Sequence, residues 1–198
     1  MWFDKSKVEW GVLAPGAVIY WCTFPSVLGE ILIAGFENNL VFLGVDSAYC
    51  AVRNDFFVFA HKKEWQIFER AEWPHFSISQ LQNNIDYYWG ALSVLSEGLT
   101  FSSVNLLITG TIFQKRVWLA LSEVSYGRTL SYSEFAGQIN CPKAVRAVAS
   151  AVAQNPIPLW LPCHRIIQKS GVFGHFHWGP VLKCRLIEAE KKKVAFLF

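Results

Sequence analysis

The chain has 198 residues, which is enough for one or two compact domains of ordinary size. Hydrophobic residues make up 53% of the chain and charged residues 17%, a balance that favours a folded globular protein and excludes an intrinsically disordered one. The first nine residues carry Asp4 and Glu9, and two prolines and a glycine interrupt the apolar stretch 11–27. We therefore expect no secretion signal, no membrane association, and a cytoplasmic (nucleoid) or nuclear location.

The net charge of +3 is divided unevenly along the chain. Residues 1–104 hold six Lys and Arg against eleven Asp and Glu, a net charge of −5, whereas residues 105–198 hold twelve against four, a net charge of +8. A basic C-terminal half indicates a polyanionic partner. The alternative is a basic surface that binds no partner. In that case the three lysines at 191–193 are only a solvated tail.

The first part of the chain predicts strands followed by helices. Segments 17–22, 30–34 and 40–45 are rich in β-branched and aromatic residues, and the turn-prone connections between them predict a β-meander. Residues 64–70 and 77–95 are predicted as helices, the second from an apolar stripe at three- and four-residue steps. A mixed domain over residues 1–104 follows from this pattern.

From residue 105 onward the pattern predicts short helices, at 113–121, at 133–139 and from Pro142 to about Gln154. The last two, joined by a tight turn, are typical of a helix-turn-helix, although an ordinary helical packing unit fits the same pattern. The sequence thus predicts an α/β (α+β) chain with a second, mainly helical domain over residues 105–198.

Five cysteines are present, an odd number with no C-x-x-C spacing, which argues against a disulfide framework or a zinc knuckle. Cys22, His61 and His75 are possible metal ligands, but their spacing does not support a site, and we predict no metal and no cofactor. Reduced thiols are expected, and a reduced thiol can act as a nucleophile.

The motif Pro162-Cys163-His164-Arg165 places such a thiol next to an imidazole, which can lower the thiol pKa or accept its proton. Adjacent side chains on an extended strand point to opposite faces, so communication between Cys163 and His164 needs a bridging water or a bent backbone. Taken alone, the motif also fits a structural cysteine beside a chance histidine.

The surrounding residues decide between these alternatives. The string 155–167, Asn-Pro-Ile-Pro-Leu-Trp-Leu-Pro-Cys-His-Arg-Ile-Ile, closely resembles the signature of the O6-alkylguanine-DNA alkyltransferases. The similarity extends through further motifs in the same order, and a looser likeness covers residues 26–29. These motifs are 110–114, Val117-Trp118, 126–132, 142–148, Gly174, Lys183 and Glu190. The resemblance implies an RNase H-like N-terminal scaffold domain and a winged helix-turn-helix-like C-terminal domain that binds DNA and carries the reaction.

The resemblance also implies a chemistry for this C-terminal domain. Cys163 is the expected acceptor of the alkyl group, His164 the base acting through a water, and Glu190 the residue that orients His164. Tyr132 is expected to hydrogen-bond the guanine ring as it leaves. The substrate is O6-alkylguanine, and also O4-alkylthymine, in double-stranded DNA. The thioether product is not readily hydrolysed, so each molecule is expected to act once. The protein is expected to be a monomer.

A base reacts in this way only after it is flipped out of the duplex. The resemblance assigns Arg146 to the gap that the base leaves and a slim helix face to the minor groove, which is about 6 Å wide. The expected DNA-binding residues are Arg146, Ala147, Ala149, Ser150 and Tyr132. The expected base pocket is formed by Asn155, Ile166, Phe176, His177 and Trp178.

Three residues depart from the family's pattern. Phe176 stands where a tyrosine is frequent, so that stacking on the base is retained and a phenol hydrogen bond is lost. Trp178 and Ala149 stand where glycine is frequent. From Trp178 we predict a narrower pocket that accepts methyl better than benzyl groups.

Two other functions fit parts of the pattern. A protein of the same fold that senses alkylated bases without repairing them would lack the reactive cysteine, which is present here. A Cys-His hydrolase or acyltransferase would need an oxyanion hole, for which the sequence offers no motif.

Overall fold

The computed structural model describes residues 8–46, 49–70, 105–171 and 176–195. The chain divides into two compact units, residues 1–109 and residues 110–198. The boundary expected after residue 104 therefore falls at the beginning of the last strand of the first unit, not at the division between the units. In the part of the chain that is described, no helix is long and apolar enough to span a membrane.

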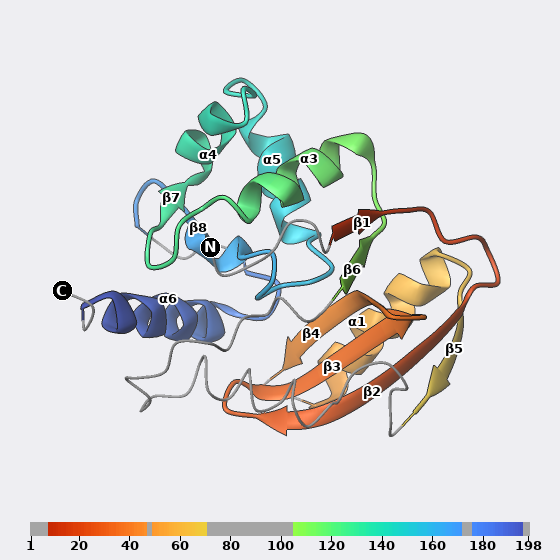
Figure 1. Cartoon of the computed structure of the whole chain (residues 1–198). Helices are drawn as coiled ribbons and strands as arrows, with labels where there is room; N and C mark the ends of the chain where they lie inside the picture. Colours follow the sequence, from red (N-terminus) through yellow and green to blue (C-terminus); the bar gives the residue numbers. More distant parts are fainter. Residues whose placement is uncertain (1–7, 47–48, 71–104, 172–175, 196–198) are drawn as a thin grey trace. The chain divides into compact units, whose positions relative to one another are not determined.

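A six-stranded mixed sheet forms the first unit, in the order β1-β6-β4-β3-β2-β5. Strands β2 (Val18–Ser26), β3 (Gly29–Phe36) and β4 (Asn39–Asp46) are antiparallel and joined by tight turns, which confirms the predicted meander. Strand β6 (Asn105–Ile108) runs parallel to both β4 and β1 (Val8–Trp10). The sheet thus combines a local meander with parallel pairings to distant segments (Figure 1).

Helix α1 (Tyr49–Lys62) packs against β3 and β4. Val52, Phe56 and Ala60 recur at four-residue steps and are fully buried, as expected for the core-facing side of a helix. The ring of Phe56 lies 5.3 Å from that of Phe42 between centroids, within the range of favourable aromatic pairs. The sequence did not predict this helix, because the continuous apolar run 56–59 obscures the apolar stripe of α1.

The helix predicted over residues 64–70 is wrong. Residues Gln66–Glu69 form strand β5, which pairs in parallel with β2. Glu64 has a φ of 56°, a left-handed conformation that ends the helical path after α1. The open edge of β2 then pairs with the next four residues, so tertiary pairing overrides local propensity. The predicted helix 77–95 lies outside the described residues.

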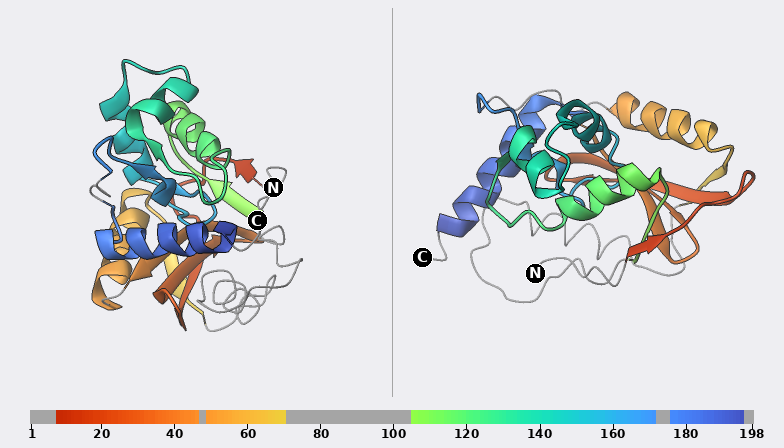
Figure 2. Two further views of the ribbon diagram at one scale, coloured as in Figure 1. Left: turned by 90° about the vertical axis from the view of Figure 1, so that its left-hand side faces the viewer. Right: turned by 90° about the horizontal axis from the view of Figure 1, so that it is seen from above.

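The second unit is mainly helical, with α3 (Ile112–Leu121), α4 (Tyr132–Gln138), α5 (Val145–Ala153) and α6 (Pro180–Ala195). Two-residue strands β7 (Leu130–Ser131) and β8 (Ile166–Ile167) pair in parallel. Helix α5 packs against both α3 and α4 (Figure 2). The predicted helix at 113–121 is confirmed, and its capping box between Thr111 and Gln114 explains where it starts.

The third predicted helix starts three residues later than expected. Pro142 and Lys143 are the central residues of a turn closed by a hydrogen bond of 2.9 Å from the Ala144 amide to the Cys141 carbonyl. Proline suits the second position of such a turn as well as a first helical turn. Helix α5 therefore begins at Val145, and Ala144 caps it without a side-chain hydrogen bond.

Two glycines of the second unit give opposite predictions for substitution by alanine. A Cβ on Gly110 would lie 2.6 Å from the ring of Trp118, which is buried and donates its indole N–H to the Ala151 carbonyl at 2.7 Å. The ring cannot move without losing that bond, so we expect Gly110→Ala to destabilise the protein by about 1–3 kcal/mol.

Gly137 is the matched control for this prediction. It lies in α4, and a Cβ built there meets nothing within 4 Å. Gly137→Ala is expected to stabilise the protein by about 0.5–1 kcal/mol, because alanine favours the helix. Urea denaturation of both variants checks the pair, and a destabilised Gly137→Ala or an unchanged Gly110→Ala contradicts it.

Candidate active site

A buried loop connects α5 to the candidate nucleophile. All residues from Asn155 to Pro162 are buried, which is unusual for a loop because its backbone polar groups must be satisfied internally. The Asn155 side chain donates to the Leu161 carbonyl at 2.6 Å and accepts from the Ile157 amide at 3.0 Å. Asn155 thus replaces the hydrogen bonds that the loop cannot form with water.

The loop ends in a single 3-10 turn, Cys163–Arg165. Successive side chains of a 3-10 turn diverge by about 120°, so the three residues of this turn face three directions. The backbone at Cys163–Arg165 is therefore bent and is not an extended strand. Cys163 faces a cavity on one side of the turn, and His164 and Arg165 face the protein interior on the other.

Cys163 is one of the residues that line this cavity. The volume of the cavity is about 10 Å³, roughly the room for one water molecule, and Cys163 is 4% exposed. Burial raises the pKa of the Cys163 thiol, while a hydrogen bond from Asn155 and the charge of Lys183 oppose the rise. The residues lining the cavity are Tyr132, Val152, Ala153, Asn155, Cys163, Phe176, His177 and Trp178.

Behind the turn, His164 contacts a buried carboxylate. Its Nε2 lies 2.8 Å from Oε1 of Glu190, and both side chains are buried. Burial lowers the pKa of His164, with Glu190 opposing this effect. Burial alone would raise the pKa of Glu190, but His164 and Arg165 outweigh it and hold that pKa at about 2. The carboxylate is therefore ionised at neutral pH and accepts a hydrogen bond from the imidazole.

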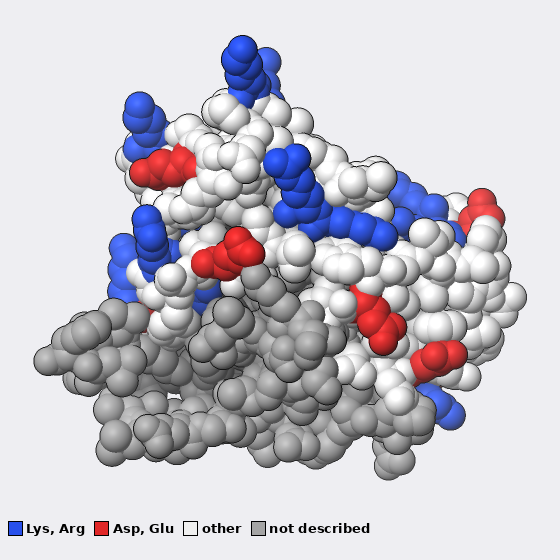
Figure 3. All heavy atoms as spheres, turned by 45° about the horizontal axis from the view of Figure 1, so that its top comes forward, with Lys and Arg blue, Asp and Glu red and all other residues white. Residues whose placement is uncertain are grey.

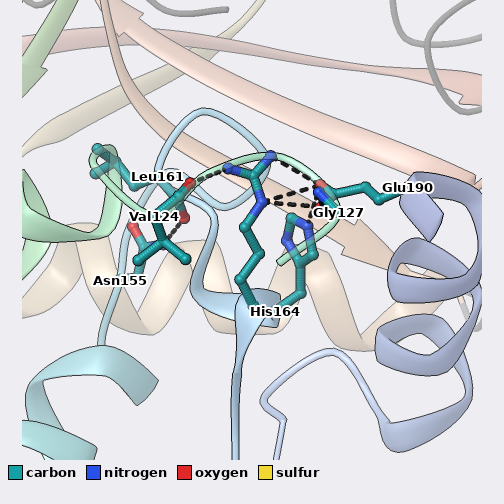
Figure 4. A network of polar contacts seen from close by, with 7 residues as sticks. Val124, Gly127, Asn155, Leu161, His164 and Glu190 are labelled. Atoms are coloured by element: carbon teal, nitrogen blue, oxygen red, sulfur yellow. Dashed lines mark hydrogen bonds and ion pairs between the residues drawn. The ribbon is translucent and has the colours of Figure 1, made fainter. Parts of the chain in front are cut away.

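Glu190 also binds a second residue of the 3-10 turn and one further segment of the same unit (Figure 4). The Nε of Arg165 lies 3.1 and 3.0 Å from the two carboxylate oxygens, and its Nη2 lies 2.8 Å from Oε1. The Gly127 amide donates to Oε2 at 3.0 Å, and Nη1 of Arg165 donates to the Val124 carbonyl at 2.6 Å. Helix α6, the 3-10 turn and the loop after α3 therefore meet at one carboxylate.

A second buried cation lies on the cavity side of α6. Lys183 is 1% exposed, and its Nζ donates to the Ile166 carbonyl. The ammonium lies 5.9 Å from the ring centroid of Tyr132 and 5.5 Å from that of Phe176. Burial lowers the pKa of Lys183 to about 8, and the charge of Cys163 partly counteracts this.

Four of the five residues predicted for DNA binding lie on α5, and the fifth, Tyr132, is the first residue of α4. Arg146, Ala147 and Ser150 are exposed, and Ala149 is half-buried, so together they offer a slim surface with one cation. Figure 3 shows Lys and Arg side chains projecting from separate points towards the top of the view, where α3, α4 and α5 lie in Figure 1. Such a surface suits a polyanion.

The structure brings together most of the predicted site, with some exceptions. Five of the expected residues, Tyr132, Asn155, Phe176, His177 and Trp178, line the cavity with Cys163. Ile166 does not line it and is instead buried in β8, with its carbonyl bound to Lys183.

Arg165, Lys183 and Val152 received no role from the sequence. Apart from its neighbour His164, Arg165 stands in an apolar run from Leu159 to Ile167, and a charge in such a run is expected to be buried and paired. That signal could have identified it. No group of three or more possible metal ligands occurs in the ranges described above.

Comparisons with known proteins agree with this geometry. Residues 112–192 match the family model of the 6-O-methylguanine DNA methyltransferase DNA binding domain. A methylated-DNA–protein-cysteine methyltransferase of Haemophilus influenzae is 32% identical over 173 residues, covering 87% of each chain. The inducible methylated-DNA–protein-cysteine methyltransferase of Bacillus subtilis is also 32% identical, over 88% of this chain and 91% of the relative.

The fold agrees as well. The structure of the Mycobacterium tuberculosis OGT in complex with DNA matches with a TM-score of 0.63 and 29% identity, over 90% of this chain and 99% of that one. The mixed α/β fold is thus that of the OGT structures. On the extent of the similarity to its curated relatives, the chain belongs to the methylated-DNA–protein-cysteine methyltransferase family.

Proposed function

We propose that this protein repairs DNA by direct reversal of damage, moving an alkyl group from O6-alkylguanine, and also from O4-alkylthymine, to Cys163. The observation that carries the proposal is a buried thiol that lines a cavity and is followed in the chain by the His164–Glu190 pair. The named activity of the relatives supports the same reaction. The N-terminal unit serves as an RNase H-like scaffold, and the C-terminal unit is a winged helix-turn-helix that acts as a monomer.

The reaction is a displacement at the alkyl carbon. The thiol proton passes through a water to His164, whose Nδ1 carries the lone pair when Nε2–H donates to Glu190. The thiolate forms a bond to the alkyl carbon, and the bond from that carbon to O6 breaks, leaving its electron pair on guanine. The product thioether is stable to hydrolysis, so the protein reacts once.

Tyr132 assists the departure of the base. Burial raises the pKa of its phenol, and the charge of Cys163 raises it further, so the hydroxyl stays protonated and can donate to the leaving ring. A cavity of about 10 Å³ is smaller than a purine, so we expect the side chains of Phe176, His177 or Trp178 to move when a base enters. Asn155 hydrogen-bonds Cys163 from the buried loop before the turn.

Intact-mass measurement after incubation with a duplex containing O6-methylguanine tests the proposal. We expect one methyl group per protein molecule, located on Cys163, and no further product once the protein is consumed. Tight binding without a gain in mass indicates a sensor of alkylated bases, and repeated turnover indicates a hydrolase or acyltransferase. Either result overturns the proposal.

Arg146 gives a prediction about base flipping. It is exposed on α5, where it can fill the gap left by an extrahelical base. Flipping costs a few kcal/mol in a duplex and least in a single strand. We therefore expect Arg146→Ala to slow methyl transfer from duplex DNA by about tenfold or more and to affect a single-stranded substrate much less.

The control for this prediction is Lys143→Ala, which removes an exposed cation from the turn before α5. A phosphate contact at that position weakens binding to both substrates alike. Single-turnover rates on both substrates separate the two roles. If Arg146→Ala slows both substrates by the same factor, Arg146 is a phosphate contact and not a substitute for the flipped base.

Trp178 gives a prediction about the size of the alkyl group. Its ring lines the cavity and lies edge-on to His177, with 4.5 Å between ring centroids. Replacing it by glycine enlarges the space beside the sulfur. We expect Trp178→Gly to raise the rate of benzyl transfer relative to methyl transfer by about tenfold, since filling or emptying an apolar pocket discriminates on this scale. Equal ratios of the two rates in both proteins contradict the prediction.

A further inference from the structure

Arg165 lies in the candidate active site but has no role in the reaction proposed above. Its side chain is fully buried, and its guanidinium binds both oxygens of Glu190 and the Val124 carbonyl. A buried arginine with a two-pronged carboxylate contact is held in one orientation. The same carboxylate binds His164, so Arg165 acts on the imidazole only through Glu190.

We propose that Arg165 is a positioning residue which neutralises and orients Glu190, so that His164 rests as a neutral base with its proton on Nε2. The inference rests on the proposed function and adds to it a reason why His164 is able to accept a proton.

The charges around His164 explain this role. A lone buried carboxylate 2.8 Å from an imidazole favours the imidazolium, which cannot accept a proton from the thiol. With Arg165 bound, the Arg165–Glu190 pair is neutral, and Lys183 adds a positive charge that disfavours a second one. Among the described residues, the charged groups that act on His164 include Arg165, Lys183 and Glu190. Cys163 precedes it in the same turn, and the ring of Tyr126 lies against the Arg165 guanidinium.

The geometry also ties the orientation of Glu190 to the backbone. Gly127 has a φ of 70°, a conformation that glycine adopts without strain, and its amide points at Oε2. Arg165 fixes the beginning of the same loop through Val124. One backbone amide and one guanidinium, itself held by the Val124 carbonyl, therefore hold the carboxylate so that Oε1 is presented to Nε2 of His164.

The first test uses the unmodified protein without DNA. Nitrogen-15 NMR of the histidine rings across the pH range reports the protonation and tautomer of His164. We expect a neutral ring protonated at Nε2 at neutral pH. An imidazolium at neutral pH, or a ring protonated at Nδ1, overturns the inference. Because no methyl transfer is needed, this result is independent of whether the proposed repair reaction occurs.

The second test compares the pH dependence of the methyl-transfer rate in Arg165→Met, Arg165→Lys and the unchanged protein. Loss of the positive charge raises the pKa of His164, so the acid limb of the Arg165→Met profile is expected to move up by about one pH unit or more. Arg165→Lys keeps the charge and loses the fork, so its rate falls while its acid limb stays in place.

A purely structural role makes a different prediction, a loss by the same factor at every pH in both variants, and that result overturns the inference. Lys169→Met, which removes an exposed cation from the same unit, is the control and is expected to leave the profile unchanged. If Arg165→Met does not fold, Arg165→Gln, which also removes the positive charge, takes its place and is expected to move the acid limb in the same direction.

Discussion

Replacing Cys163 by alanine is expected to abolish methyl uptake and to leave binding to duplex DNA unchanged. Cys163 is the only thiol among the described residues that line the cavity, and Arg146, Ala147 and Ser150, which are predicted to bind DNA, are exposed on α5. A thiolate is a far better nucleophile towards carbon than the phenol or imidazole groups beside it. Intact-mass measurement and gel-shift titration with the same lesion-bearing duplex check both parts.

Cys141→Ala and Cys184→Ala are the matched controls. Both thiols are partly exposed and outside the cavity, so each variant is expected to take up one methyl group as the unchanged protein does. Methyl transfer that persists in Cys163→Ala, or that disappears in either control, shows that another group accepts the alkyl carbon.

Replacing Glu190 by glutamine is expected to lower the free energy of unfolding by about 3–5 kcal/mol, because Arg165 is left as a buried charge without its partner. The same change slows methyl transfer, since His164 loses the carboxylate that orients it. Urea denaturation at neutral pH measures the first effect and single-turnover kinetics the second.

The pH dependence of stability gives this prediction a second part. The folded pKa of Glu190, about 2, lies below its ordinary value of 4.5, so the unfolded chain binds the proton more tightly. The stabilisation is complete above pH 4.5 and is lost as the pH falls towards 2. In Glu190→Gln this contribution is absent, and the stability curve is flatter in that window.

Glu188→Gln is the control, because Glu188 is exposed on the same helix and its carboxylate lies 3.4 Å from the sulfur of Cys184. It is expected to change stability by less than about 0.5 kcal/mol. A Glu190→Gln protein as stable as this control would mean that Arg165 finds another partner, and the account of the buried network would be wrong.

Local patterns in the sequence predicted the elements that local interactions determine. The meander 18–46 was predicted because β-branched residues and short turns specify neighbouring strands. Helix α3 was predicted because its apolar stripe is regular. Strand β5 was missed because its pairing with β2 comes from a partner more than forty residues away, which a local window does not contain.

The candidate site also contains residues that could be predicted from the sequence and residues that could not. Residues of the motif around Cys163 were predicted from the resemblance, and the structure gathers most of them at one cavity. The role of Lys183 could not be predicted from local pattern, because a cation in a basic half of the chain is indistinguishable from a surface charge until its burial is known. Only the fold shows that Lys183 is inside.

The carboxylate of Glu190 has a consequence for the order of events during synthesis. It contacts Gly127, 63 residues earlier in the chain, and His164, 26 residues earlier. Chains emerge from the ribosome from the N-terminus onward and fold as segments become available. Until α6 has been made, Glu190 cannot orient His164 next to Cys163 of a nascent chain. The thiol is therefore expected to stay unreactive until the C-terminal unit has folded.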